Sequence, residues 1–118
     1  MDTVQNILRR REERRLALEK ALVDVIRQLE AMGALKIILF GSLARGEVNS
    51  WSDLDLIAVM PPHLSGREWM RKIYDEVERG IACDILAYTE KELAEMWPVS
   101  GFVRHALKEG KVVYEKKP

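Results

Sequence analysis

The sequence predicts an α/β fold in which a small mixed β-sheet packs against helices. Three observations support this. A helical apolar stripe near the N-terminus is long, later apolar runs are short enough to be strands, and helix-start signals alternate with those runs. The 118 residues can bury one hydrophobic core but not two. We therefore expect a single domain over residues 1–118.

Residues 2–32 are predicted to form one long N-terminal helix. Gly33 is a suitable C-terminal cap. The charged stretch Arg9–Arg15 interrupts the apolar pattern; it indicates either a solvated helix face with internal ion pairs or a contact with a partner or nucleic acid. Apolar residues at spacings of three and four should face the sheet: Leu18, Leu22, Val25, Leu29 and Met32.

The next segment predicts two strands joined by a short connection. Residues 35–40 form an apolar run that stops at Gly41, and a single helical turn over 43–45 should end at Gly46. Residues 52–59 start polar and become a second strand. If the end of the first strand faces the start of the second, the two strands run antiparallel.

The remaining chain alternates helices and strands. Ser65–Glu68 and Thr89–Glu92 have the capping-box pattern that opens a helix. The expected elements are, in order, a helix from 66 to about 79, a strand over 81–88, a short helix that ends before Pro98, a helix over 101–109 capped by Ser100, and an edge strand over 111–114.

Three aspartates are the candidate catalytic and metal-binding residues. Asp53 and Asp55 share one face at the start of a strand, where two carboxylates repel each other unless a cation lies between them. Asp84 interrupts an otherwise apolar strand, and a buried carboxylate needs a partner. That partner is either a metal ion or a basic residue in a structural salt bridge. We favour Mg²⁺, with two ions, because it prefers oxygen ligands.

Gly41, Ser42 and Arg45 are the candidate nucleotide-binding residues. Glycine allows a sharp turn and close approach to a ligand, and the following helical turn presents amide groups to phosphate. The Ser42 side chain could also serve as a helix N-cap. Arg45 either reaches a triphosphate or pairs with an acidic residue. For Trp51 we favour a hydrophobic plug over the site, and for Cys83 a core thiol.

These residues form a pattern that resembles a known family. The sequence Gly41-Ser42-Leu43-Ala44-Arg45-Gly46, followed by Ser52-Asp53-Leu54-Asp55-Leu56, is similar to the minimal nucleotidyltransferases (MNT) of the DNA polymerase β superfamily. The resemblance covers roughly residues 20–90, with Asp84 at the place of the third carboxylate. It implies a polymerase β-type nucleotidyltransferase fold with neighbouring strands in the order one, two, three. It also implies Mg²⁺-dependent transfer of AMP from ATP. In such a reaction Asp53 and Asp55 would bridge two metal ions and Asp84 would complete the ion that activates the acceptor hydroxyl, which makes Asp84 the best candidate for general base.

The resemblance also implies a partner. MNT proteins are commonly paired with a small helical HEPN protein, an RNase toxin, and act as its antitoxin, in some cases by adenylylating it. Two alternatives are an antitoxin that only binds its partner and an enzyme that modifies a small molecule. Val4, Ile7 and Leu8 are candidates for a subunit contact in a homo-oligomer.

Composition narrows the setting. Acidic and basic residues balance, so net charge favours neither nucleic acid nor a membrane. The sequence lacks a membrane-length apolar run and a signal peptide, and its single cysteine fits a reducing compartment. We expect a cytoplasmic protein.

Overall fold

A computed structural model describes residues 3–118 and shows helices and strands alternating along the chain. The predicted helix start at residue 2 lies outside this range. The elements are, in order, α1 Val4–Ala31, β1 Lys36–Phe40, α2 Gly41–Arg45, β2 Leu54–Val59, α3 Gly66–Glu76, β3 Cys83–Tyr88, α4 Glu90–Met96, α5 Gly101–Glu109 and β4 Lys111–Glu115.

The four strands form one mixed sheet in the order β3-β2-β1-β4. β1 pairs antiparallel with β2 and with β4, whereas β2 and β3 are parallel. The expected α/β architecture, the antiparallel first pair and the neighbouring order of the first three strands are therefore confirmed. The C-terminal end of β1 and the N-terminal ends of β2 and β3 consequently lie at the same end of the sheet.

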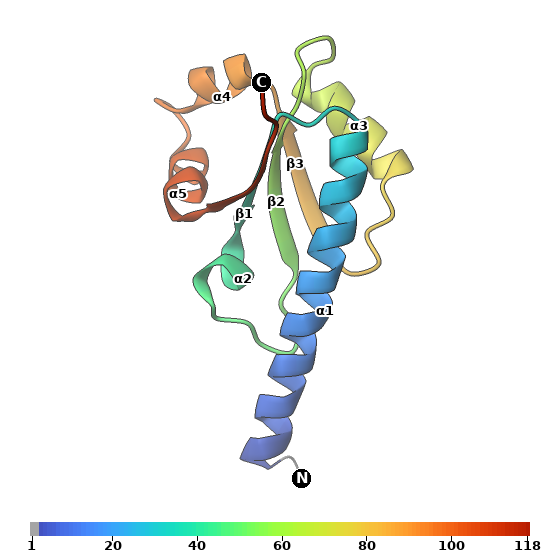
Figure 1. Cartoon of the computed structure of the whole chain (residues 1–118). Helices are drawn as coiled ribbons and strands as arrows, with labels where there is room; N and C mark the ends of the chain where they lie inside the picture. Colours follow the sequence, from blue (N-terminus) through green and yellow to red (C-terminus); the bar gives the residue numbers. More distant parts are fainter. Residues whose placement is uncertain (1–2) are drawn as a thin grey trace.

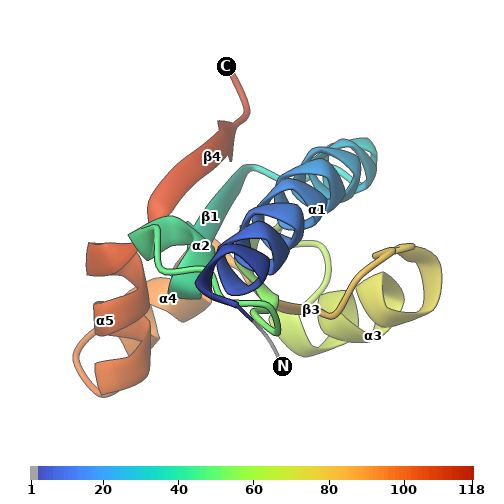
Figure 2. The same cartoon turned by 90° about the horizontal axis from the view of Figure 1, so that it is seen from below.

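Helices cover both faces of the sheet (Figures 1 and 2). α1 and α3 lie over one face, where Leu18, Val25 and Leu29 of α1 belong to the main core together with Trp69 and Ile73 of α3. α5 lies over the other face, and a smaller cluster there joins its Ala106 to Ile38 and Ile57 of the strands. The strands β1, β2 and β3 thus contribute alternate side chains to the two cores.

The N-terminal part of α1 extends beyond the sheet (Figure 1). α1 is unbroken from Val4 to Ala31, and Leu18 is its first buried residue. Thr3 caps it by accepting a hydrogen bond from the Asn6 N–H. We call residues Val4–Ala17 the α1 arm. Its charged stretch carries internal ion pairs, including Arg9 with Glu13, as the solvated-face interpretation predicts.

α3 is shorter than predicted. It ends at Glu76, and Val77 takes an extended conformation with a buried side chain. The backbone of Glu78 bonds to α1 instead: its N–H donates to Gln28 Oε1 at 2.8 Å, and its carbonyl accepts from Gln28 Nε2 at 2.6 Å. A tertiary contact therefore ends the helix before Gly80. Both predicted capping boxes are present.

Candidate functional site

The candidate site lies at the end of the sheet where β1 finishes and where β2 and β3 begin, next to α2 (Figure 1). Asp55 is the second residue of β2, where it is the register partner of Phe40 at the end of β1. On its other side, Asp55 is the register partner of Asp84 in β3. The topology therefore brings Gly41, Asp55 and Asp84 to one place from three separate segments.

Asp55 has the most perturbed environment of the three aspartates. It is half-buried, and this burial raises the pKa of its carboxyl, while the charges of Asp84 and Asp53 raise it further and that of Arg45 opposes them. Each effect follows from elementary electrostatics, since both burial and like charges disfavour the ionised form. A cation at this position would relieve the repulsion.

Asp84 and Asp53 are exposed, which corrects one premise of the sequence argument. An apolar neighbourhood in the sequence suggested a buried Asp84. However, β3 is an edge strand and Asp84 lies near its open end. Its carboxylate therefore needs no buried partner, and it is accessible to a molecule that approaches from solvent. Asp53 comes just before β2 rather than within it.

Gly41 packs directly against Asp55. Its φ is +80°, in the left-handed region that favours glycine, and an added Cβ would overlap Asp55 Oδ2 and lie 3.1 Å from Asp55 Cγ. α2 starts at Gly41, and Phe40 occupies the N-cap position without a side-chain bond. The interpretation of Ser42 as the N-cap is therefore wrong. Ser42 is the second residue of the helix, where amide groups have no acceptor within the helix.

Arg45 makes the acidic pairing that the sequence left open. Its Nε donates to Glu47 Oε2 at 3.0 Å, and both side chains are exposed. An exposed ion pair of this kind contributes about 0–1 kcal/mol, so it holds Arg45 only weakly. The guanidinium also lowers the pKa of Asp55, which places its positive charge close enough to act on the site.

Arg14 is a residue of this site that the sequence analysis missed. Its Nε donates to the Ser52 carbonyl at 2.8 Å, and its Nη2 lies 3.8 Å from Asp53 Oδ1. The available signal was its position four residues before Leu18, on the face of the helix that packs against the sheet. Trp51, in contrast, is 75% exposed. The prediction that it plugs the site is wrong.

Cys83 packs against the main core, as predicted for a core thiol. It is partly buried, and burial raises the pKa of the thiol to about 12; the neighbouring aspartates add to this effect and Arg79 opposes it. The thiolate is therefore scarce near neutral pH, which argues against a nucleophilic role.

The fit of this site to Mg²⁺ rests on its donor chemistry. Within residues 3–118, no three His, Cys, Asp or Glu side chains are grouped closely enough to hold a metal ion. The three aspartates nevertheless act on one another electrostatically at Asp55, and carboxylate oxygens are the donors that Mg²⁺ prefers. Because Mg²⁺ is usually held by one or two carboxylates together with substrate phosphates, Asp53, Asp55 and Asp84 are the residues that would hold it alongside a bound nucleotide.

No helix in the described part of the chain is long and apolar enough to cross a membrane.

Comparisons with known proteins identify the family. A comparison with curated proteins gave no significant match. A crystal structure from Sulfolobus solfataricus, described as that of a "putative nucleotidyltransferase", has a TM-score of 0.66 at 15% identity and covers 91% of this chain and 88% of its own. The family model for the nucleotidyltransferase domain matches residues 18–113, and the chain therefore belongs to that family, within the polymerase β-like superfamily.

Proposed function

We propose that this protein transfers AMP from ATP to a hydroxyl group of a partner protein. The observation that carries the proposal is the register pairing of Asp55 with Asp84, beside the glycine at which α2 begins. This arrangement places repelling carboxylates next to the first turn of a helix, so a cation and a phosphate group would each find a complementary surface.

In the proposed reaction, the acceptor hydroxyl oxygen attacks the α-phosphorus of ATP. The bond from that phosphorus to the bridging oxygen breaks, and pyrophosphate leaves. Bound Mg²⁺ would supply charge stabilisation for the attacking and leaving oxygens of such an in-line displacement. Asp53 and Asp55 would bind the metal ions, and Asp84 accepts the proton of the hydroxyl. The exposure of Asp84 supports this role, because the acceptor must reach it from solvent.

The nucleotide is held by the start of α2. Backbone amides of Gly41 and Ser42 donate to the β- and γ-phosphates, together with the Ser42 hydroxyl. Glycine at position 41 supports this assignment, since its missing side chain lets the backbone at the start of α2 lie directly against Asp55. Arg45 adds positive charge near the triphosphate when it leaves Glu47.

The proposed acceptor is a HEPN-type helical toxin, which makes this protein its antitoxin. The resemblance to MNT proteins motivates this choice, and the openness of the site supports a large acceptor: Trp51, Asp53 and Asp84 are all exposed around it. The α1 arm adds exposed apolar side chains at Val4 and Leu8 that a protein partner could cover.

The test combines the purified protein, Mg²⁺, ATP labelled at the α-phosphate and the purified product of the adjacent gene, which we propose to be a HEPN protein. We expect label on the partner, and we expect Asp84→Asn to abolish it. Asp75→Asn is the matched control, because Asp75 is an exposed aspartate on α3, away from the site. Complex formation without label would instead favour an antitoxin that acts by binding, and label on a small molecule would redirect the acceptor assignment.

A further inference from the structure

The α1 arm is connected to the candidate site through Arg14. The Arg14 side chain is 24% exposed, and its Nε hydrogen bond to the Ser52 carbonyl spans 38 residues of sequence. Ser52 is buried and immediately precedes Asp53. The bond therefore fixes the peptide group that leads into the first of the three aspartates.

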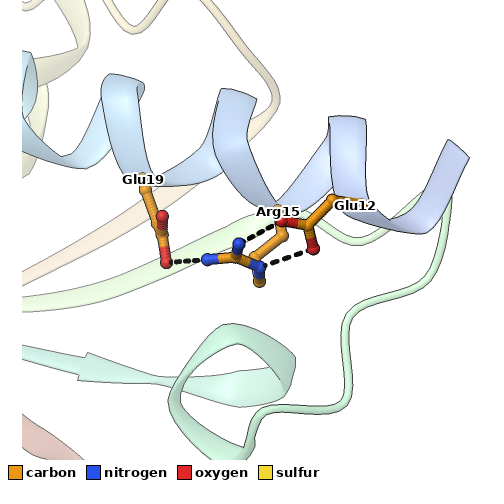
Figure 3. A network of polar contacts seen from close by, with 3 residues as sticks. All are labelled: Glu12, Arg15 and Glu19. Atoms are coloured by element: carbon orange, nitrogen blue, oxygen red, sulfur yellow. Dashed lines mark hydrogen bonds and ion pairs between the residues drawn. The ribbon is translucent and has the colours of Figure 1, made fainter. Parts of the chain in front are cut away.

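The next residue, Arg15, forms its ion pairs within α1 instead of reaching the site. Arg15 lies between Glu12 and Glu19 and forms ion pairs with both of them, within α1 (Figure 3). Its Nη1 is 2.7 Å from Glu19 Oε1. Arg14 and Arg15 thus share a charge and a helix, but Arg14 alone of this pair reaches the loop of the site.

The loop before β2 also has hydrogen bonds of its own, which join Asn49 to Trp51 and Ser52. Ser52 Oγ accepts from the Asn49 N–H at 2.9 Å, and the Trp51 N–H donates to Asn49 Oδ1 at 3.0 Å. At the other end, the Leu54 N–H donates to the Ala82 carbonyl at 3.0 Å. Asp53 therefore lies between the start of the sheet and the peptide that Arg14 holds.

We propose that Arg14 is a positioning residue that keeps Asp53 at the metal site and so strengthens the binding of a divalent cation. This inference rests on the proposed function, because it takes Asp53 as a metal ligand. Arg14 itself does not touch the reacting atoms. It acts through the Ser52 carbonyl, and no sequence motif contains it.

The guanidinium has two opposite effects on a cation, and geometry decides between them. Its charge near Asp53 competes with the cation, but that contact is 3.8 Å long and Asp53 is about half exposed. Such an ion pair is weak and screened by solvent. The Nε hydrogen bond is 2.8 Å long and partly buried, and bonds from a charged donor are the stronger class. Positioning should therefore outweigh competition.

The test compares Arg14→Gln and Arg14→Lys with Arg15→Gln in the full chain. Mn²⁺ alone serves as the probe, with its free concentration measured by electron paramagnetic resonance, and hydrogen exchange reports the amides of residues 52–54. Arg14→Gln should weaken Mn²⁺ binding about tenfold, the loss expected for one charge-assisted hydrogen bond. It should also accelerate exchange at these amides. Arg15→Gln should match the wild type in both measurements.

Arg14→Lys separates charge from geometry. Lysine keeps the positive charge but cannot reproduce the planar fork that reaches Ser52 and Asp53 together. An intermediate loss of Mn²⁺ affinity supports positioning. The positioning role would be overturned if Arg14→Lys and Arg14→Gln both bound Mn²⁺ as tightly as the wild type. It would also be overturned if Arg14→Gln bound Mn²⁺ more tightly than the wild type.

The two proposals can fail separately. If the wild type binds Mn²⁺ and Arg14→Gln weakens that binding, but no AMP is transferred, the proposed function fails and the role of Arg14 stands. If AMP is transferred and Arg14→Gln behaves like Arg15→Gln, the inference alone fails. A wild type that binds no Mn²⁺ would overturn the inference as well.

Discussion

Asp55 and Asp84 are register partners on the parallel strands β2 and β3, so the fold itself places two carboxylates side by side. Asp55 is half-buried and Asp84 is exposed. The pair is therefore asymmetric. Burial and neighbouring negative charges disfavour the ionised form of Asp55, whereas the carboxylate of Asp84 is open to solvent. This asymmetry suits a division between a residue that holds a metal ion and one that takes a proton.

The unfavourable electrostatic environment of Asp55 predicts that Asp55→Asn stabilises the protein in the absence of metal. Burial and repulsion by Asp84 and Asp53 raise the pKa of Asp55 above its ordinary value of 3.8, so its ionised form opposes folding at neutral pH. Thermal unfolding in chelator at pH 7 should give a higher melting temperature for Asp55→Asn than for the wild type. Asp75→Asn, at an exposed site on α3, is the control.

The pH dependence of this difference follows from its sign. The destabilisation is fully present above the raised pKa of folded Asp55. It disappears as the pH falls, because the folded state binds the proton before the unfolded state does. The melting temperatures of wild type and Asp55→Asn should therefore converge as the pH approaches 3.8. A wild type that is more stable than Asp55→Asn at pH 7, and loses this advantage on acidification, would show instead that the surroundings stabilise the ionised form of Asp55.

Gly41 predicts a second separation, between stability and function. Gly41 and Gly46 both have positive φ values, +80° and +71°, so alanine at either position should lower the free energy of unfolding by about 1–2 kcal/mol. Only Gly41 lies against Asp55, whereas an added Cβ at Gly46 would have no neighbour within 4 Å. Asp55 must therefore move in Gly41→Ala.

Gly41→Ala should accordingly lose metal binding and AMP transfer, and it should lose more stability than Gly46→Ala because of the overlap with Asp55. Gly46→Ala should keep both metal binding and AMP transfer. Denaturant unfolding and Mn²⁺ titration of the two variants check this directly. Equal metal affinity in the two variants would mean that the close approach of Gly41 to Asp55 does not matter for the site.

Cys83 offers a third prediction. Because burial raises the pKa of its thiol to about 12, little thiolate is present at pH 8, and alkylation by iodoacetamide should be at least about tenfold slower in the folded protein than in urea. Cys83 is the register partner of Leu54. A modified thiol should disturb the strand pair that carries Asp55 and Asp84. Equal alkylation rates in the two states would show that Cys83 is freely accessible.

Sequence reasoning reached the parts of the fold that local signals encode. Capping boxes placed the starts of α3 and α4, and short apolar runs placed the strands, because these signals act within a few residues. The family resemblance placed Asp84 as the third carboxylate of the site, but the register that pairs it with Asp55 was not predicted, because strand register is a tertiary property.

What sequence reasoning missed depends on contacts between distant segments. α3 ends early because Gln28 of α1 bonds to the backbone of Glu78. Arg14 joins the site because α1 lies across the loop that contains Ser52. Asp84 is exposed because β3 lies at the edge of the sheet, and no local pattern states that position.

Arg45 gives the last prediction, because the structure shows its acidic pairing with Glu47 and triphosphate binding stays a prediction. Its ion pair with Glu47 joins two exposed side chains, and such pairs contribute little to stability. Glu47→Gln should therefore leave the melting temperature unchanged and free the guanidinium. If Arg45 binds the triphosphate, Glu47→Gln should lower the KM for ATP slightly, and Arg45→Gln should raise it with a smaller effect on kcat.

The ion pair alone predicts a different result. If Arg45 served only to fix the connection after α2, Glu47→Gln and Arg45→Gln would remove the same contact and change the steady-state kinetics in the same direction. Opposite shifts in KM therefore indicate phosphate binding, and parallel shifts indicate a structural pair. Arg45→Lys refines the result, since lysine keeps the charge that lowers the pKa of Asp55 but loses the bidentate geometry that suits a phosphate.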